Sequence, residues 1–205
     1  MTDATPDLGE PDEDRPIPLR LSVALVHHPV YDKHHKVVAT ALTNLDLHDI
    51  ARSSRTFGVQ RFFIVHPVAA QRELAQRIAS HWTGAEGAEK NDFRRQAIDL
   101  LQVVPDLEAA VAAMTATHGR RPKVVATAAK DRGGGAPIGF AALRQLAARE
   151  PALMVLGTGW GLTDELLATC DFRLPPIHGA GTYNHLSVRS ACAILLDRIY
   201  GDRED

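Results

Sequence analysis

Two glycine-rich stretches near the carboxyl end decide the fold of this chain: LMVLGTGWGLTDEL (residues 153–166) and LPPIHGAGTYNHLSVRSACAILLDRI (residues 174–199). The first begins with an apolar run, typical of a buried strand, and ends in a glycine-bearing turn. The second begins with a short strand and a Gly/His/Asn loop and continues directly into a strongly apolar helix. Two such loops, each at the carboxyl end of a strand, predict a small-molecule pocket made largely of backbone.

The segments before and between these stretches alternate between strands and helices. Their apolar periodicity predicts strands over residues 20–27, 60–66, 123–127, 153–157 and 172–175, and helices over residues 44–57, 69–82, 106–117, 138–149 and 185–200. This order predicts an α/β fold with a mainly parallel sheet flanked by helices. Ligands bind beyond the carboxyl ends of strands in such sheets, so the loops after Thr127, Leu156 and Ile177 form the candidate site.

The length of 205 residues predicts a single domain over residues 19–200. Residues 1–18 are expected to form a disordered acidic tail, and residues 201–205 a second, short tail. Six acidic side chains against one arginine give the first tail a charge of −5, and three against one give the second −2. Since the whole chain carries −2, the body carries +5. A mildly basic body is compatible with a polyanionic partner without requiring one.

Several classes of protein are excluded by composition. No apolar run approaches the roughly 20 residues that a membrane helix needs, and the acidic N-terminus lacks the apolar core of a signal peptide. The two cysteines, Cys170 and Cys192, lie in apolar contexts without metal or redox spacing, so both are expected to be buried. These features predict a cytoplasmic protein that does not contact the membrane.

The GTGWGL run (residues 157–162) superficially resembles a dinucleotide-binding pattern but does not complete G-x-G-x-x-G. Its glycines permit close backbone approach to a flat, weakly charged ligand, although a tight strand–helix turn also explains them. In IHGAGTYNHLS (residues 177–187), Asn184 or Ser187 is placed to cap the next helix. Capping does not explain the polar residues Tyr183 and His185 beside it.

Three ordered segments resemble the motifs of the SPOUT superfamily, the S-adenosylmethionine-dependent RNA methyltransferases with a C-terminal trefoil knot. DLHDIARSSRTFGVQRFFIV (residues 46–65) is similar to the first motif, VLGTGWGL (residues 155–162) to the second and YNHLSVRSA (residues 183–191) to the third. The similarity covers most of residues 19–200 and is strongest to a small group related to the bacterial tRNA guanine methyltransferases.

The resemblance implies a fold, a cofactor and partners. It implies a knotted C-terminal half, a homodimer with the pocket near the subunit interface, and methyl transfer from S-adenosylmethionine to a base or ribose of RNA, either tRNA or rRNA, with S-adenosylhomocysteine as product. Carried over by motif, the cofactor-binding residues are Thr127, Leu156, Gly157, Thr158, Gly161, Ile177, Gly179, Asn184, His185, Leu186 and Ser187. No metal is expected.

The helix that begins near Asn44 supplies the candidate catalytic residues. Methyl transfer to a ring nitrogen or a ribose hydroxyl releases a proton, so a general base is expected. Asp46 is the candidate base, Arg52 is suited to hold an RNA phosphate or orient the target, and His48 shares a helix face with Arg52. An acidic residue near a helix N-terminus is also favourable on electrostatic grounds alone, which leaves a structural role for Asp46 open.

The chain departs from the family pattern near the chemistry. Asp46 and His185 stand where relatives have asparagine, and the second motif, with Gly159 near its centre, lacks a glutamate found in many relatives. These departures leave open a second hypothesis, that the chain is a SPOUT-fold module that binds cofactor or RNA without transferring a methyl group. A third hypothesis is a metal-dependent hydrolase built on HHPVYDKHH (residues 27–35), although this spacing matches no zinc pattern. In the same loop, Tyr31 is expected to stack on an RNA base.

Overall fold

The computed structural model describes residues 19–84, 92–181 and 183–201. The acidic tail expected over residues 1–18 and most of the short tail over residues 201–205 lie outside this part of the chain. No helix in the described part is both long and apolar enough to cross a membrane.

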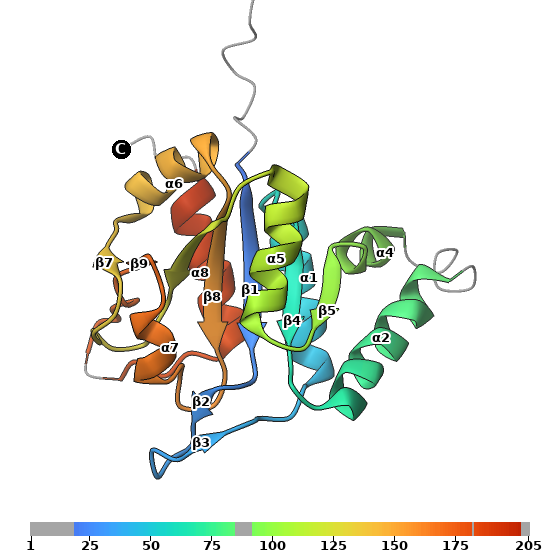
Figure 1. The fold of residues 1–205 in the computed structure, drawn as a ribbon, viewed down its shortest axis with the longest axis horizontal. Helices are drawn as coiled ribbons and strands as arrows, with labels where there is room; N and C mark the ends of the chain where they lie inside the picture. Colours follow the sequence, from blue (N-terminus) through green and yellow to red (C-terminus); the bar gives the residue numbers. More distant parts are fainter. Residues whose placement is uncertain (1–18, 85–91, 182, 202–205) are drawn as a thin grey trace, which may run out of the picture.

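A seven-stranded sheet forms the centre of the molecule (Figure 1). Its strands, in spatial order, are β5 (Leu101–Val104), β4 (Phe62–Val65), β1 (Leu21–Val26), β8 (Ala152–Gly157), β6 (Lys123–Ala126), β9 (Phe172–Arg173) and β7 (Ala136–Pro137). All six pairings within this sheet are parallel, which confirms the expected α/β architecture. A separate antiparallel pair, β2 (Val30–Tyr31) and β3 (Val37–Val38), lies below it.

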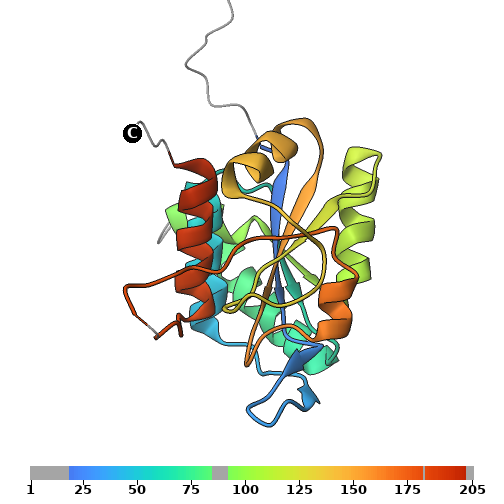
Figure 2. The same ribbon diagram turned by 90° about the vertical axis from the view of Figure 1, so that its left-hand side faces the viewer.

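Helices cover both faces of the sheet. They are α1 (Asn44–Thr56), α2 (Ala69–Thr83), α4 (Asp92–Ile98), α5 (Leu107–His118), α6 (Phe140–Arg149), α7 (Asp164–Ala168) and α8 (Val188–Tyr200). Figure 2 shows α8 on one side of the sheet and α5 and α7 on the other.

The two hydrophobic cores follow the alternation of side chains along β1. Leu21, Val23 and Leu25 pack with buried residues of α1, α6 and α8, whereas Ala24 and Val26 pack with those of α5 and α7. Successive side chains of a strand point to opposite faces, so a strand covered on both faces is apolar throughout. This explains why all six residues of β1 are buried.

The structure contains short elements that the sequence patterns do not predict: α4, β5, α7, β7 and the β2–β3 pair. Elements of two to seven residues are too short to display a hydrophobic period. The last helix begins at Val188 rather than at residue 185. Ser187 caps it, because its hydroxyl accepts a hydrogen bond from the Ser190 N–H at 3.3 Å.

The carboxyl ends of β1, β6 and β8 meet at one edge of the sheet, because these neighbouring strands are parallel. Three long connections therefore converge there. In Figure 2 the segment between β9 and α8 crosses the loop between β6 and α6. The Asn184 amide donates a hydrogen bond to the Ala129 carbonyl, which ties the two segments together.

Candidate functional site

A cavity of about 840 Å³ lies at this edge of the sheet. Its walls come from the segment before α1, the loop after β6, the loop after β8 and the segment before α8. The volume lies within the range of about 300–1,000 Å³ that is usual for small-molecule sites. The position matches the general rule for ligands in parallel sheets.

The cavity brings together nearly all the residues that the resemblance assigns to the cofactor. Those in its lining are Thr127, Leu156, Gly157, Thr158, Gly161, Ile177, Asn184, His185, Leu186 and Ser187. Gly179 is the exception, since it is absent from the lining. The three motif segments are therefore adjacent in space although about 140 residues separate the first from the last.

Two glycines allow the loop after β8 to form its tight turn. A Cβ on Gly157 would lie 2.7 Å from the backbone nitrogen of Leu162. Gly159 has a φ of +58°, and a Cβ there would lie 2.9 Å from the Tyr31 carbonyl oxygen. Both contacts are closer than real Cβ atoms approach, so any side chain would displace this wall of the cavity.

Thr40 and Thr158 form a directed hydrogen-bond chain in this wall. The Thr158 hydroxyl donates to the Val26 carbonyl at 3.2 Å, so the Thr40 hydroxyl is the donor in the 2.5 Å contact between the two threonines. Thr40 Oγ1 then accepts from Nδ1–H of the buried His27 at 3.0 Å. The Thr127 hydroxyl is likewise committed to the Val155 carbonyl at 2.9 Å. Toward the cavity these threonines are hydrogen-bond acceptors.

Two neutral histidines hold Thr40 in place. His66 Nδ1 accepts from the Val68 N–H at 3.1 Å, so its Nε2–H donates to the Thr40 carbonyl at 2.9 Å. Burial, assisted by the nearby His66, lowers the pKa of His27 to about 4. Burial also lowers the pKa of His66. Nε2 of His27 is the unprotonated ring nitrogen, because Nδ1 carries the proton donated to Thr40, and it is buried with no hydrogen-bond partner among the described residues.

Asp46 lies at the cavity, where its carboxylate is held on both oxygens. Thr43 Oγ1 donates to Oδ2 at 2.6 Å, and Arg189 Nη1 donates to Oδ1 at 3.1 Å. The side chain of Asp46 is only 11% exposed. Arg189, from the first turn of α8, also lines the cavity and contacts Asp49 at 3.4 Å.

Arg189 is a site residue that the sequence reasoning missed. It belongs to the YNHLSVRSA segment, two positions after the helix cap Ser187, so the motif contained the signal. The Arg189–Asp46 pair joins the third motif to the first, across 143 residues of sequence.

His48 and Arg52 do not line this cavity. They border a separate hollow between α1, α2 and α4. Successive residues of a helix turn by about 100°, so His48 and Arg52 share a face that points away from Asp46. Within one chain, the three expected catalytic residues are therefore divided between two sides of α1.

The histidine-rich loop contributes one residue, His35, to the cavity. No three His, Cys, Asp or Glu side chains in the described part of the chain are arranged to hold a metal ion. Tyr31, which is expected to stack on a base, lies with its ring centre 5.3 Å from the Arg132 guanidinium and its hydroxyl 3.4 Å from Asp164. These contacts hold the hairpin against the loop after β6 and the start of α7, and Val30 pairs with Leu162 in the loop after β8.

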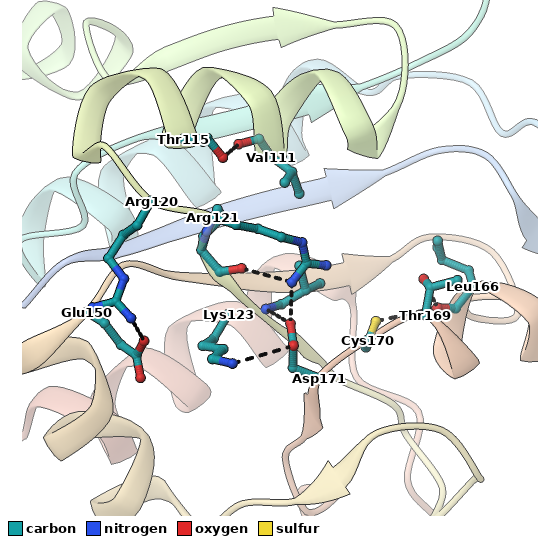
Figure 3. Close-up of polar contacts among 12 residues, drawn as sticks. Val111, Thr115, Arg120, Arg121, Lys123, Glu150, Leu166, Thr169, Cys170 and Asp171 are labelled. Carbon is teal, nitrogen blue, oxygen red and sulfur yellow. Dashed lines mark hydrogen bonds and ion pairs between the residues drawn. The ribbon is translucent and has the colours of Figure 1, made fainter.

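A second polar cluster, shown in Figure 3, lies at the opposite ends of the strands. Asp171 accepts from the Val124 N–H at 2.8 Å and from Arg121 at 3.0 Å, and Lys123 lies 3.8 Å away. Burial opposes ionisation, but these donors dominate and lower the pKa of Asp171. Because Asp171 precedes β9, the cluster anchors the strand that leads toward the cavity and serves the fold rather than the site.

Known proteins are similar to this chain in sequence and in fold. A protein-family model described as SAM-dependent RNA methyltransferase matches residues 20–201. A "tRNA (guanine-N(1)-)-methyltransferase" of Oleidesulfovibrio alaskensis is 42% identical over 195 residues, which are 95% of this chain and 45% of that protein. A protein of Aquifex aeolicus without a stated activity is 38% identical over 180 residues. These residues are 87% of this chain and 87% of that protein.

Among solved structures, TrmJ from Z. mobilis ZM4 superposes with a TM-score of 0.58 at 14% identity, covering 90% of this chain and 70% of that one. At this identity the similarity shows the fold alone. The chain spans about half the length of the named methyltransferases that it matches. The family match covers nearly the whole described domain and confirms the resemblance. The chain therefore belongs to the family of S-adenosylmethionine-dependent RNA methyltransferases.

Proposed function

We propose that this chain binds S-adenosylmethionine in the cavity at the carboxyl edge of the sheet and transfers the methyl group to a nucleotide of tRNA or rRNA. The observation that carries the proposal is the convergence of all three family motifs on one cavity. The named relatives are about twice as long as this chain, so their guanine-N1 specificity belongs to whole proteins. For this chain, the proposed acceptor is an atom of either a base or a ribose.

The lining fits the cofactor. Leu156, Ile177 and Leu195 supply an apolar surface for adenine, and the glycines of the loop after β8 allow the backbone to approach it closely. The Thr127 and Thr158 hydroxyls face the cavity as acceptors, which suits ribose hydroxyls or an ammonium group. When bound, the cofactor supplies an electrophilic methyl group on a sulfonium.

The residues of this chain have to orient the acceptor and receive its proton. A ring nitrogen or ribose hydroxyl that accepts a methyl group would lose its proton, so the site needs a side chain that can receive this proton. We propose Asp46 as the proton acceptor and Arg189 as the group that holds the carboxylate toward the cavity. Positioning of the two reactants supplies much of the remaining rate.

We further propose a cytoplasmic homodimer with a C-terminal trefoil knot. The crossing of the segment before α8 over the loop after β6 supports the knot (Figure 2). The division of Asp46 from His48 and Arg52 supports the dimer, because a second copy can place the hollow that these two residues border beside the cavity of its partner. Mixing Asp46→Asn with Arg52→Ala chains tests this: recovery of about a quarter of the activity supports shared sites, and no recovery contradicts them.

The cofactor and the reaction are tested separately. Calorimetry should detect binding of S-adenosylmethionine and S-adenosylhomocysteine, and no binding of either at high micromolar concentration contradicts the cofactor site. Labelled methyl groups should enter total RNA from a deletion strain, and mass spectrometry of its nucleosides should then identify the acceptor atom.

A binding module without turnover is the second candidate function. Both carboxylate oxygens of Asp46 are already engaged, which favours this alternative. A protein that binds the cofactor with normal affinity but transfers no labelled methyl group to any undermethylated RNA would support the binding module.

A further inference from the structure

A second hollow, of about 590 Å³, lies between α1, α2 and α4. Arg52 borders it from α1, Arg77 and Trp82 border it from α2, and Arg94 borders it from α4. Asp46, at the methyl-transfer cavity, lies on the other side of α1 from this hollow. A helix with its side chains is about 10–12 Å across, so one helix separates the two sites.

The hollow is positively charged. Among the described residues that line it, three are arginines and one, Asp49, is a carboxylate, so these residues carry a formal charge of +2 (three minus one). Asp49 also contacts Arg189 at 3.4 Å, so part of its charge is already balanced from the cavity side. Burial is the main cause that lowers the pKa of the half-buried His48. The nearby Arg94 and Arg52 lower it further, and Asp49 opposes them. Two of the three arginines are therefore close enough to His48 to oppose its protonation.

One of these guanidinium groups lies over an aromatic ring. Arg94 lies over the ring of Trp82, 4.3 Å from its centre, and His48 and His81 meet the same ring edge-on at 5.7 Å and 5.1 Å. Trp82 itself packs against the main hydrophobic core. An unpaired RNA base can stack on a guanidinium group that lies over an aromatic ring, and arginine side chains bind phosphates.

We propose that this hollow binds the backbone of the substrate RNA beside the nucleotide that enters the cavity. Arg52 and Arg77 contact phosphates, and Arg94 on Trp82 carries an adjacent base. The inference rests on the proposed function for the identity of the ligand, but it assigns a surface that the cofactor site does not include. A basic surface of this kind is compatible with the +5 charge of the body of the chain.

The test measures binding of fluorescein-labelled bulk tRNA by anisotropy over a series of salt concentrations. Arg77→Ala should reduce the slope of log affinity against log salt by about 0.7, the value for one lost single-strand phosphate contact, and Arg77→Glu should weaken binding about tenfold. Trp82→Leu should weaken binding several-fold, and Trp82→Phe should restore most of it because the ring remains. Arg149→Glu is the matched control, since this exposed arginine lies on α6, across the molecule from α2 and α4 (Figure 1).

The outcomes separate this inference from the proposed function. Affinity for S-adenosylhomocysteine should be unchanged in all four hollow variants, because the cavity lies beyond α1. An Arg77→Glu protein that binds tRNA within twofold of the unmodified protein and of Arg149→Glu overturns the inference. Light scattering identifies a different role: if Arg77→Glu turns a dimer into monomers without altering tRNA affinity, the hollow is a subunit contact. If the unmodified protein binds cofactor but no tRNA, both this inference and the RNA substrate fail.

Discussion

The two sides of α1 present sites of different construction. On the Asp46 side, the cavity is formed mainly by backbone, glycines and threonines whose hydrogen bonds are fixed by neighbouring strands. On the Arg52 side, the hollow is formed by long side chains of three helices. The first arrangement suits a small ligand of constant shape, and the second suits a flexible polyanion. The contrast teaches that substitutions should separate cofactor binding from RNA binding.

The largest expected effect is at the backbone of the cavity. Gly159→Val should weaken cofactor binding by about 100-fold, because its Cβ meets the Tyr31 carbonyl and displaces the loop. Gly119→Val is the control: it has a φ of +70° but open space around its Cβ, so it shares only the backbone strain. Calorimetry with S-adenosylhomocysteine measures both. Equal losses in the two variants would contradict a role for the contact with Tyr31.

Asp46→Asn should lower kcat by about 100-fold with little change in cofactor affinity, because the amide keeps the size but cannot accept the proton. The measurement is single-turnover methyl transfer at saturating cofactor, with binding measured in parallel. Arg189→Lys should cause a smaller loss, since lysine retains the charge without the planar geometry. A normal rate in Asp46→Asn would exclude this residue as the base and weaken the contrast between the two sides of α1.

The buried histidine predicts a pH dependence of stability. Burial holds the folded pKa of His27 at about 4, below its ordinary value of 6.5, so the unfolded chain binds more protons between these limits. His27 therefore does not oppose folding above pH 6.5, and it lowers stability as the pH drops toward 4. The expected loss between pH 7 and pH 5 is about 2 kcal/mol, measurable by urea unfolding. His27→Gln should flatten this dependence, and an unchanged slope would contradict the assignment.

The smallest expected effect concerns the threonine chain. Thr40→Val should weaken cofactor binding about fivefold, because His27 Nδ1–H loses its acceptor and Thr158 loses its donor. Thr40→Ser retains the hydroxyl and should restore the affinity. Binding of tRNA at the hollow should be unchanged in both. If tRNA binding falls with cofactor binding, the two sides of α1 are coupled.

The sequence by itself determined the fold class and the cofactor loops. Parallel strands produce long apolar runs, and the glycines after β8 are required by local backbone geometry, so both leave clear local patterns. The motif order was sufficient to assign ten cavity residues, although Gly179 lies outside the lining. Short elements such as α4 and the β2–β3 pair lack enough residues to show a period.

Only the tertiary structure decided how the charged residues are grouped. The Arg189–Asp46 pair joins residues 143 positions apart, and the hollow gathers arginines from three helices. Neither arrangement has a local signature, because it depends on how α1 packs between α8 on one side and α4 on the other. The sequence placed Asp46 and Arg52 in one catalytic helix. The turn of that helix, fixed by the burial of Leu47, Ile50 and Ala51, places them on two different sites.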